Sequence, residues 1–138
     1  MNPGGFPALI DHVSITVRDL ERAGRFYNAV LEALGYPRVT ASEARIGYGV
    51  RKRSEDDRQA YISVVKSDHV VADRRHWAFV APDRRAVERF HAAGLAGGGR
   101  DDGAPGLRPA YHAHYYAAFL LDPDGNRIEA VCHGPPEG

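Results

Sequence analysis

The sequence predicts an α+β domain made of two modules, each with the element order β-α-β-β-β. An internal repeat is the first observation: HVSITVRDLERAGRFYNAVLEALG, from His12, aligns without gaps with HWAFVAPDRRAVERFHAAGLAGGG, from His76. The second is that each copy reads as a strand of alternating apolar residues followed by a helix with one apolar stripe. Aspartates at equivalent positions, Asp19 and Asp83, mark the start of each helix. Two copies at this spacing indicate a pseudo-twofold pair of modules.

Length and composition predict a single cytoplasmic domain over residues 1–138, with modules at about 9–66 and 74–133. Lys+Arg and Asp+Glu both number 18, so the net charge is zero and no nucleic-acid or membrane partner is expected. The first residues lack the basic segment and long apolar core of a signal peptide. The single cysteine, Cys132, excludes an internal disulfide and a cysteine-cluster metal site.

The first module is expected to begin after a leader rich in Pro and Gly, residues 1–8. Residues 9–17 alternate as a strand with one face on a core. Asp19 then caps a helix through Leu34, and Gly35 can end it because glycine adopts positive φ without strain. The remaining expected segments are strands at 38–40, 43–50 and 59–65, a solvated hairpin loop at 51–58 and a polar linker at 66–74.

The second module repeats this order from the strand at His76, with Trp77 and Phe79 expected to face the helices in the core. Asp83 caps a helix to about Ala93. Residues 94–109 are rich in Gly, Asp and Pro and predict a long loop, with at most a short strand near 99–101, that would cover a binding site. The expected closing hairpin comprises strands 114–121 and 126–133, joined by the turn DPDG at 122–125.

Strand alternation places Glu129 on the face opposite to that of Ile128 and Cys132. The same argument puts His12 and His76 on the polar faces of equivalent strands, so a twofold relation would aim both imidazoles into one cleft. Ser63 is the first-module counterpart of Glu129, so the cleft gains one carboxylate. Two histidines and one carboxylate are a common ligand set for Fe(II), Mn(II) or Zn(II).

Further candidates lie in RPAYHAHYYAAF, residues 108–119. His112 and His114 are each either an acid–base group near neutral pH or a surface histidine, and spacing favours His112. Tyr115 and Tyr116 point to opposite faces of a strand, so only one lines the cleft. Arg100 and Arg108 flank the expected loop, where they either meet an anionic substrate or are solvated. Cys132 is expected to be an inert buried thiol.

Three segments carry a resemblance that covers about residues 9–133: IDHVSITVRDLERAGRFY, HWAFVAPD and DPDGNRIEA. The chain resembles the vicinal oxygen chelate superfamily, which includes glyoxalase I, fosfomycin-resistance thioltransferases, extradiol dioxygenases and bleomycin-binding proteins. The resemblance implies paired βαβββ modules forming an open, cupped, barrel-like mixed sheet with helices on the outside. It also implies a homodimer and one divalent metal held by His12, His76 and Glu129.

Differences from the sequence patterns of individual members narrow the choice among the activities of the superfamily. Metal-dependent glyoxalase I has a fourth ligand, a carboxylate near Ser63, so serine there argues against glyoxalase activity. The extradiol pattern of histidine, tyrosine, Asp-Pro-x-Gly turn and glutamate fits at His112, at 122–125 and at Glu129. Phe119 occupies its tyrosine position, which argues against ring cleavage unless Tyr115 or Tyr116 substitutes. Bleomycin-binding relatives lack the metal ligands that this chain retains.

Two functional hypotheses follow. In the first, the chain is an enzyme: a lyase, transferase or dioxygenase whose Fe, Mn, Zn or Ni ion acts as a Lewis acid on the vicinal oxygens of a small substrate. His112, Tyr115 or Tyr116 would move protons. In the second, the chain binds and sequesters a small molecule of the antibiotic type without turnover. The sequence does not choose between modules that pair within one chain and modules that pair across a dimer.

Overall fold

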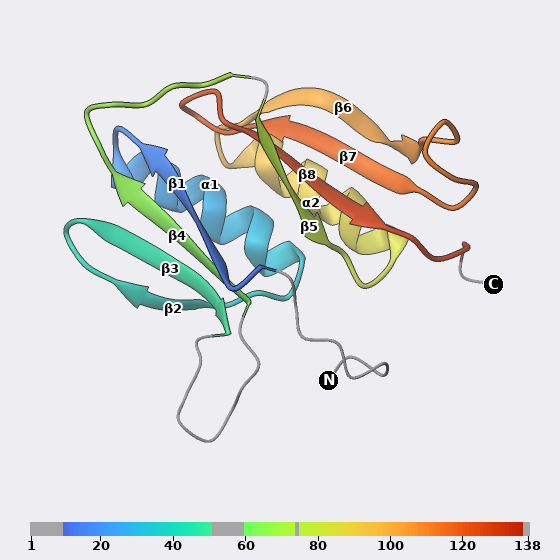
Figure 1. The fold of residues 1–138 in the computed structure, drawn as a ribbon, viewed down its shortest axis with the longest axis horizontal. Helices are drawn as coiled ribbons and strands as arrows, with labels where there is room; N and C mark the ends of the chain where they lie inside the picture. The colour runs from blue at the N-terminus through green and yellow to red at the C-terminus, as the bar shows by residue number, and fades with distance from the viewer. Residues whose placement is uncertain (1–9, 51–59, 74, 137–138) are drawn as a thin grey trace.

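A computed structural model describes residues 10–50, 60–73 and 75–136 of the chain (Figure 1). The expected leader and the expected hairpin loop at 51–58 lie outside these residues. The elements in chain order are β1 (His12–Val17), α1 (Leu20–Ala33), β2 (Arg38–Ala41), β3 (Arg45–Val50), β4 (Ala60–Lys66), β5 (His76–Val80), α2 (Arg84–Ala96), β6 (Arg100–Leu107), β7 (Tyr116–Leu121) and β8 (Arg127–Cys132). The predicted β-α-β-β-β order of both modules is confirmed.

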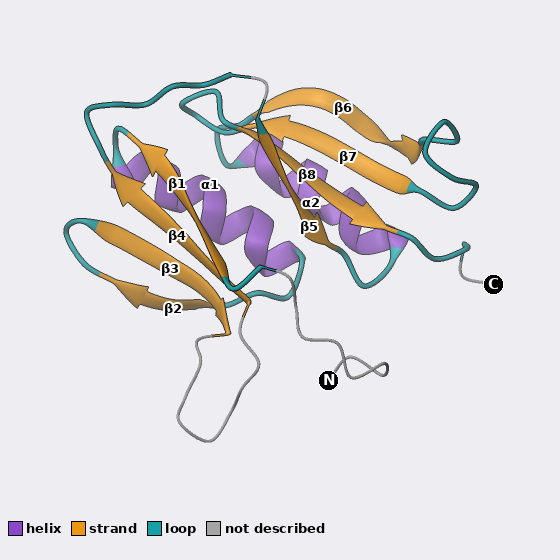
Figure 2. Cartoon of the chain, viewed as in Figure 1, coloured by secondary structure: helices purple, strands orange, loops and turns teal. Residues whose placement is uncertain are grey.

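The strands form two four-stranded mixed sheets, with the orders β1-β4-β3-β2 and β5-β8-β7-β6. In each sheet the first strand pairs in parallel with the last strand of its module, and the other pairs are antiparallel. Both helices lie on the same side of the sheets, behind the strands in Figure 2, and α1 packs against α2. The opposite side of each sheet, which we call the cup face, is left free of helices.

Both helices begin as the sequence predicts. The side chain of Asp19 accepts a hydrogen bond from the backbone N–H of Arg22 at 3.1 Å, and that of Asp83 accepts one from Ala86 at 2.7 Å. Each bond satisfies an N–H that has no partner within the helix and stabilises it by about 1 kcal/mol. Gly35 follows α1 with φ +89°, the conformation that a glycine at this position was expected to adopt.

The main core lies between the helices and the sheets. Phe26 of α1 and Phe90 of α2 are fully buried there, and burying each ring contributes about 1.5–3 kcal/mol. The helix-facing residues of β8, Ile128, Ala130 and Cys132, belong to the same cluster, as strand alternation predicts. A second, smaller cluster on the cup face contains Ala117, Phe119 and Val131, with Tyr115 packed against it. Cys132 is buried, as expected for an inert thiol.

The prediction of a long loop at 94–109 is wrong. Helix α2 continues to Ala96, and β6 then pairs with β7 as the edge strand of the second sheet. Backbone pairing outweighs the Gly- and Pro-rich composition here because Pro105 falls within a register shift between Gly103 and Gly106, on a strand that has a neighbour on one side only. Because these residues are built into the sheet, they do not form the expected lid.

The prediction that Trp77 is a core residue is also wrong. Phe79 is buried in the main core, whereas Trp77 is 38% exposed. Helix α2 packs over β6, β7 and β8, and β5 is the far edge strand of that sheet, so its first residues extend beyond the main cover of the helix. Alternation assigned the correct face, but it could not show how far the helix covers that face.

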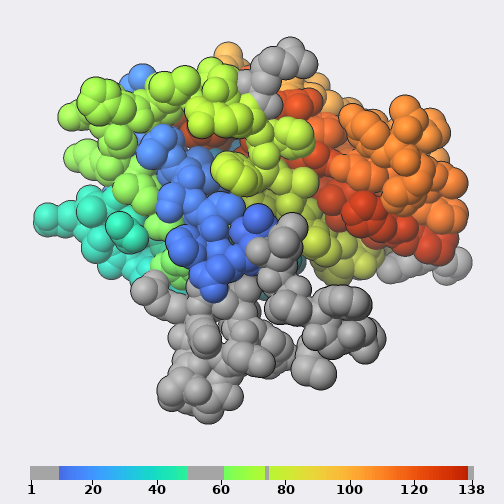
Figure 3. Space-filling view, viewed as in Figure 1, coloured from blue at the N-terminus to red at the C-terminus, as the bar shows by residue number. Residues whose placement is uncertain are grey.

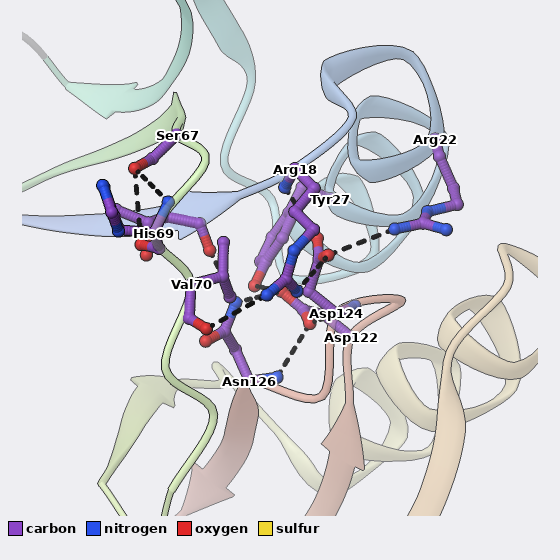
Figure 4. A network of polar contacts seen from close by, with 10 residues as sticks. Arg18, Arg22, Tyr27, Ser67, His69, Val70, Asp122, Asp124 and Asn126 are labelled. Atoms are coloured by element: carbon purple, nitrogen blue, oxygen red, sulfur yellow. Dashed lines mark hydrogen bonds and ion pairs between the residues drawn. The ribbon is translucent and has the colours of Figure 1, made fainter.

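The turn between β7 and β8 docks onto the first module (Figure 4). Asp122, which is fully buried, accepts a hydrogen bond from the hydroxyl of Tyr27 in α1 at 2.6 Å and bonds from Asn126 within the turn. The Asn126 side chain also donates to the carbonyl of Thr16 at the end of β1, at 2.9 Å. This network joins the two modules through buried polar groups, each of which has a partner.

Asp124 adds a charged contact to the same junction. Its carboxylate accepts from the guanidinium of Arg22 at 3.1 Å and from the backbone N–H of Arg18 at 3.2 Å. The side chain of Asp124 is 1% exposed, whereas those of Arg18 and Arg22 are 56% and 44% exposed. The arginines therefore cover a buried carboxylate while remaining partly solvated. Neither described helix is long and apolar enough to cross a membrane.

Candidate functional site

His76 and Glu129 meet on the cup face of the second sheet. They lie on the adjacent strands β5 and β8, where Glu129 is in register with Ala78, two residues beyond His76. The Nε2 atom of His76 lies 3.1 Å from Oε1 of Glu129. The side chain of Glu129 is 2% exposed and that of His76 is 37% exposed. The pair therefore combines a buried carboxylate with an imidazole that solvent can reach.

Tyr115 holds the other oxygen of this carboxylate. Its hydroxyl donates to Oε2 of Glu129 at 2.5 Å. Burial, and then the hydrogen bond to Glu129, raise the pKa of Tyr115 above its ordinary value. The hydroxyl therefore remains protonated at neutral pH and acts as a donor. Both carboxylate oxygens of Glu129 are thus oriented by side chains that the sequence singled out.

His12 stands apart from this pair. Its side chain is 58% exposed, and its Nδ1 lies 2.7 Å from the carboxylate of the neighbouring Asp11. Within residues 10–50, 60–73 and 75–136, no three histidine, cysteine, aspartate or glutamate side chains gather closely enough to hold a metal ion. The described chain therefore brings two of the three expected ligands together and leaves the third on the other sheet.

A cleft of about 270 Å³ lies where the edges of β1 and β5 approach each other. The two segments are neighbours on the face seen in Figure 3, where β1 is blue and β5 is yellow-green. The lining of the cleft is largely apolar: Ile10, Asp11, His12, Val13, Tyr36, Gly49, Tyr61, Ile62, Trp77, Ala78, Phe79 and Val80. His12 thus lines this cleft, whereas His76 and Glu129 do not.

His112 belongs to a group of rings beside Tyr115. Its Nε2 lies 2.8 Å from Nδ1 of His133, and its Nδ1 accepts the backbone N–H of His114 at 3.0 Å. Because Nδ1 is an acceptor, the hydrogen of a neutral His112 ring lies on Nε2 and is donated to His133. The sequence argument did not single out His133. Strand alternation could have found it, since Glu129 and His133 are separated by an even number of residues on β8 and its extension.

The two adjacent tyrosines separate as predicted. Tyr115 lies on the cup face with Glu129, whereas the hydroxyl of Tyr116 donates to Glu88 of α2 at 2.7 Å. His114 contributes its backbone N–H to the loop before β7, and its side chain is exposed. Of the tyrosine candidates for proton transfer, only Tyr115 therefore touches the His76–Glu129 pair.

Ser63 occupies the position in the first sheet that Glu129 has in the second. It is in register with Ser14 of β1, as Glu129 is with Ala78 of β5. Its side chain is 2% exposed, and its hydroxyl has no hydrogen-bond partner among the described residues. The first sheet therefore offers a small buried hydroxyl where glyoxalase I would present a carboxylate.

Phe119 stands where the extradiol pattern has a tyrosine. It pairs directly with Glu129 across the β7–β8 ladder, and the centroid of its ring lies 6.0 Å from that of His76. The position is therefore beside the candidate site, as the pattern requires, but it contributes no hydroxyl. Tyr115 supplies a hydroxyl to Glu129 from a neighbouring position.

Comparison with known proteins identifies the family of the chain. A sequence model of the Glyoxalase/Bleomycin resistance protein/Dioxygenase superfamily matches residues 9–130. Catechol-2,3-dioxygenase of Bacillus subtilis (strain 168) is 30% identical over an alignment of 146 residues, which covers 91% of this chain and 42% of that protein. The chain thus spans less than half the length of this curated relative.

Solved structures agree with the fold. A glyoxalase/bleomycin resistance protein from Albidiferax ferrireducens T118 has a TM-score of 0.75 and 32% identity, covering 90% of this chain and 98% of that one. Lactoylglutathione lyase from Agrobacterium tumefaciens has a TM-score of 0.61 and 19% identity, covering 91% and 94%, and shares the fold. With its repeated modules, its mixed sheets and a sequence match over most of its length, the chain belongs to the Glyoxalase/Bleomycin resistance protein/Dioxygenase superfamily.

Proposed function

We propose that the chain is a divalent-metal-dependent enzyme that binds a small substrate through adjacent oxygens, with His76 and Glu129 as metal ligands. The observation that carries this proposal is the 3.1 Å separation of His76 Nε2 and Glu129 Oε1. Two ligands at a right angle, each with a bond of about 2.1 Å, stand about 3.0 Å apart. The donor atoms, one imidazole nitrogen and one carboxylate oxygen, also suit Fe(II), Mn(II), Zn(II) or Ni(II).

His12 is proposed as the third ligand, supplied by a second copy of the chain in a homodimer. Its equivalence to His76 in the repeat and the family resemblance support its role. Its separation from His76 and Glu129 supports the dimer, because one chain gathers only two of the three ligands among the described residues. A twofold pair of chains would place the first sheet of one copy opposite the second sheet of the other.

The bound ion would supply a Lewis acid that stabilises negative charge on the substrate oxygens. Tyr115, held protonated beside Glu129, orients that carboxylate by donating its hydroxyl hydrogen to Oε2. His112 packs edge-on against Tyr115, with ring centroids 5.5 Å apart, and hydrogen-bonds to His133. We therefore assign the positioning of Glu129 to Tyr115, and proton transfer to the exposed pair of His112 and His133, whose rings both pack against Tyr115.

A second candidate function is binding without turnover. It is favoured by the cleft between β1 and β5, which exposes Trp77 and Val80 and excludes His76 and Glu129 from its lining. A planar apolar ligand would suit that cleft through stacking on Trp77. Tight ligand binding that needs no metal and produces no product would support this function over the first.

Metal content tests the proposal most directly. The protein is purified without chelator or nickel affinity resin, dialysed against Fe(II), Mn(II), Zn(II) or Ni(II) in turn and measured by mass spectrometry. We expect about one equivalent of one ion in the wild type and loss of that ion in His76→Ala and Glu129→Gln. His69→Ala, which removes an exposed histidine outside the site, should retain the metal. A wild type that takes up none of the ions would overturn the metal proposal.

The same preparations test the dimer. His12→Ala should lose metal affinity, yet an equimolar mixture of His12→Ala and His76→Ala should regain some of it. In a site shared between chains, mixed dimers restore one complete set of ligands, whereas ligands from a single chain would give no recovery. Sedimentation equilibrium of the wild type should give the mass of two chains.

A further inference from the structure

The cup face beside His76 and Glu129 carries two guanidinium groups, both of which pack against the ring of Phe119. The guanidinium carbon of Arg127 lies 4.5 Å from the centroid of the Phe119 ring, and that of Arg108 lies 5.5 Å from it. Phe119 is itself paired with Glu129 in the sheet, and its ring is next to His76. The positive charges therefore lie on the face that holds the candidate metal ligands.

The two arginines differ in how their charge is balanced. The Nε of Arg127 donates to the carboxylate of Asp102 at 2.6 Å, so this cation already has an anionic partner. In the part of the chain that the structure describes, the guanidinium of Arg108 donates only to backbone carbonyls: those of Ala104 and Gly106 at 2.9 Å and that of Leu107 at 3.5 Å. No carboxylate pairs with Arg108 within residues 10–50, 60–73 and 75–136. Its charge is anchored but not neutralised.

The backbone of β6 makes room for this arrangement. A Cβ at Gly103 would lie 3.2 Å from Nη2 of Arg108 and 3.0 Å from Cδ1 of Phe119, and one at Gly106 would lie 3.3 Å from Nη1. Gly103 also has φ +153°, a conformation that other residues rarely adopt. The glycines therefore let the side chain of Arg108 fold back over β6, the strand that precedes it, toward Phe119 instead of extending into solvent.

The anchored guanidinium retains free donors. A guanidinium has five N–H groups, and the carbonyl contacts use hydrogens on Nη1 and Nη2, which leaves Nε–H and part of Nη2 without a partner among the described residues. A planar pair of N–H groups matches two oxygens of a carboxylate or phosphoryl group. The backbone N–H of Arg108 also bonds to the carbonyl of Tyr115 at 2.7 Å, which ties the cation to the residue that holds Glu129.

We propose that Arg108 is a specificity-determining residue that binds an oxyanion group, carboxylate or phosphoryl, of the substrate whose adjacent oxygens bind at His76 and Glu129. Arg127, which also packs against Phe119, contributes a second positive charge that Asp102 partly neutralises. This inference deepens the proposed function by naming the substrate class as a small anion. A neutral diol or catechol would leave the positive charge of Arg108 without an anionic partner in the site.

The test uses nuclear magnetic resonance of ¹⁵N-labelled protein, which observes the arginine Nε–Hε groups individually. Protein treated with chelator and protein loaded with zinc are each titrated with inorganic phosphate, with phosphonoacetate and with neutral hydroxyacetone, at low salt. We expect the Arg108 Nε–Hε signal to shift saturably with both anions and not with hydroxyacetone. Arg108→Gln and Arg108→Lys lack this signal, so phosphate binding to them is followed through the backbone amide signals, which are also recorded for the wild type. Arg108→Gln should weaken phosphate binding by about tenfold or more, since hydrogen bonds to charged groups are the stronger class.

Matched variants separate binding from folding. Arg100→Gln removes an exposed arginine at the start of β6, the strand that precedes Arg108, and should leave phosphate binding unchanged. Arg108→Lys keeps the charge and loses the fork, so it should bind phosphate more weakly than the wild type and more tightly than Arg108→Gln. If Arg108→Gln fails to fold, the order of wild type, Arg108→Lys and Arg100→Gln still decides the matter.

The outcomes also separate this inference from the metal proposal. Saturable phosphate binding at Arg108 in a protein that takes up no metal would support the anion site and overturn the metal centre. Metal uptake together with phosphate shifts that are unsaturable, or equal in wild type and Arg108→Lys, would overturn the anion site and leave the metal centre intact.

Discussion

At the scale of single residues, Glu129 is the buried carboxylate of the candidate site. A carboxylate that is 2% exposed is costly unless its oxygens are bonded, and here Tyr115 and His76 meet one oxygen each. The sequence predicted that Glu129 and His76 lie on the polar faces of their strands, because strand alternation and the repeat can both be recognised in short stretches of sequence. The sequence left Tyr115 and Tyr116 as alternatives. Tyr115 directly precedes β7 and Tyr116 begins it, so only the observed backbone shows which hydroxyl reaches the carboxylate.

Tyr115→Phe should weaken metal binding by about 10- to 100-fold, because the substitution removes the donor that orients Glu129. It should also destabilise the fold by about 1–3 kcal/mol, the cost of leaving a buried acceptor unpaired. Competition with a zinc chelator measures the first effect, and urea unfolding measures the second. Tyr116→Phe, which loses a hydrogen bond on the opposite face, should keep wild-type zinc affinity. Equal zinc affinity in the two variants would contradict this role for Tyr115.

At the scale of elements, the sequence predicted best where pattern and backbone agree. The caps at Asp19 and Asp83 and the alternation of β8 gave the correct starts and faces. It failed at β6, where glycine and proline mark a loop by composition but the strand is held by pairing with β7. Long-range pairing of this kind leaves no local signal, so the error came from a tertiary contact that outweighed local preference.

Gly103→Ala should destabilise the protein by about 1–2 kcal/mol, because Gly103 has a positive φ and an added Cβ would lie 3.0 Å from Phe119. Gly106→Ala is the matched control: its added Cβ would lie 3.3 Å from the movable end of Arg108 and at an ordinary contact distance, 3.9 Å, from the carbonyl oxygen of Ala104. The midpoint of urea unfolding should fall for Gly103→Ala and change little for Gly106→Ala. A larger effect at Gly106 would show that the strain lies elsewhere in β6.

At the scale of the whole molecule, the sequence predicted two modules but not their placement. Among the described strands, no hydrogen-bonded pair joins the two sheets, and the modules meet through α1 against α2 and through the turn before β8. No pattern within either module encodes that arrangement. The sequence correctly assigned His12 and His76 to the polar faces of their strands. It could not show that the two side chains are far apart, because that depends on how the modules are placed.

The junction between modules should respond to alkaline pH through Tyr27. Burial, and then the negative charge of Asp122, raise the pKa of Tyr27 well above its ordinary value. A group whose pKa is raised on folding stabilises the folded state fully below its unfolded pKa, and that stabilisation is lost as pH rises through the folded pKa. The free energy of unfolding should therefore fall as pH rises above about 10, where unfolded tyrosine ionises.

Urea unfolding at a series of pH values from neutral to strongly alkaline measures this dependence. Tyr27→Phe should be less stable than the wild type at neutral pH, because Asp122 loses a donor. It should also lose less stability on going to alkaline pH. Tyr111→Phe, which changes an exposed ring, should follow the wild-type curve. Parallel curves for the wild type and Tyr27→Phe would show that this tyrosine does not set the alkaline response.

The docking of the turn before β8 has a consequence for biosynthesis. Tyr27 and Asp122 are 95 residues apart, and Asn126 is 110 residues from Thr16, so a ribosome completes the first module long before it makes the turn. The first module is then available as a template, and the turn finds Tyr27 and the carbonyl of Thr16, its partners outside the second module, only on that surface. A second module produced alone would lack those partners. The two halves therefore share an element order but not a role, because the later one completes its buried contacts on the earlier.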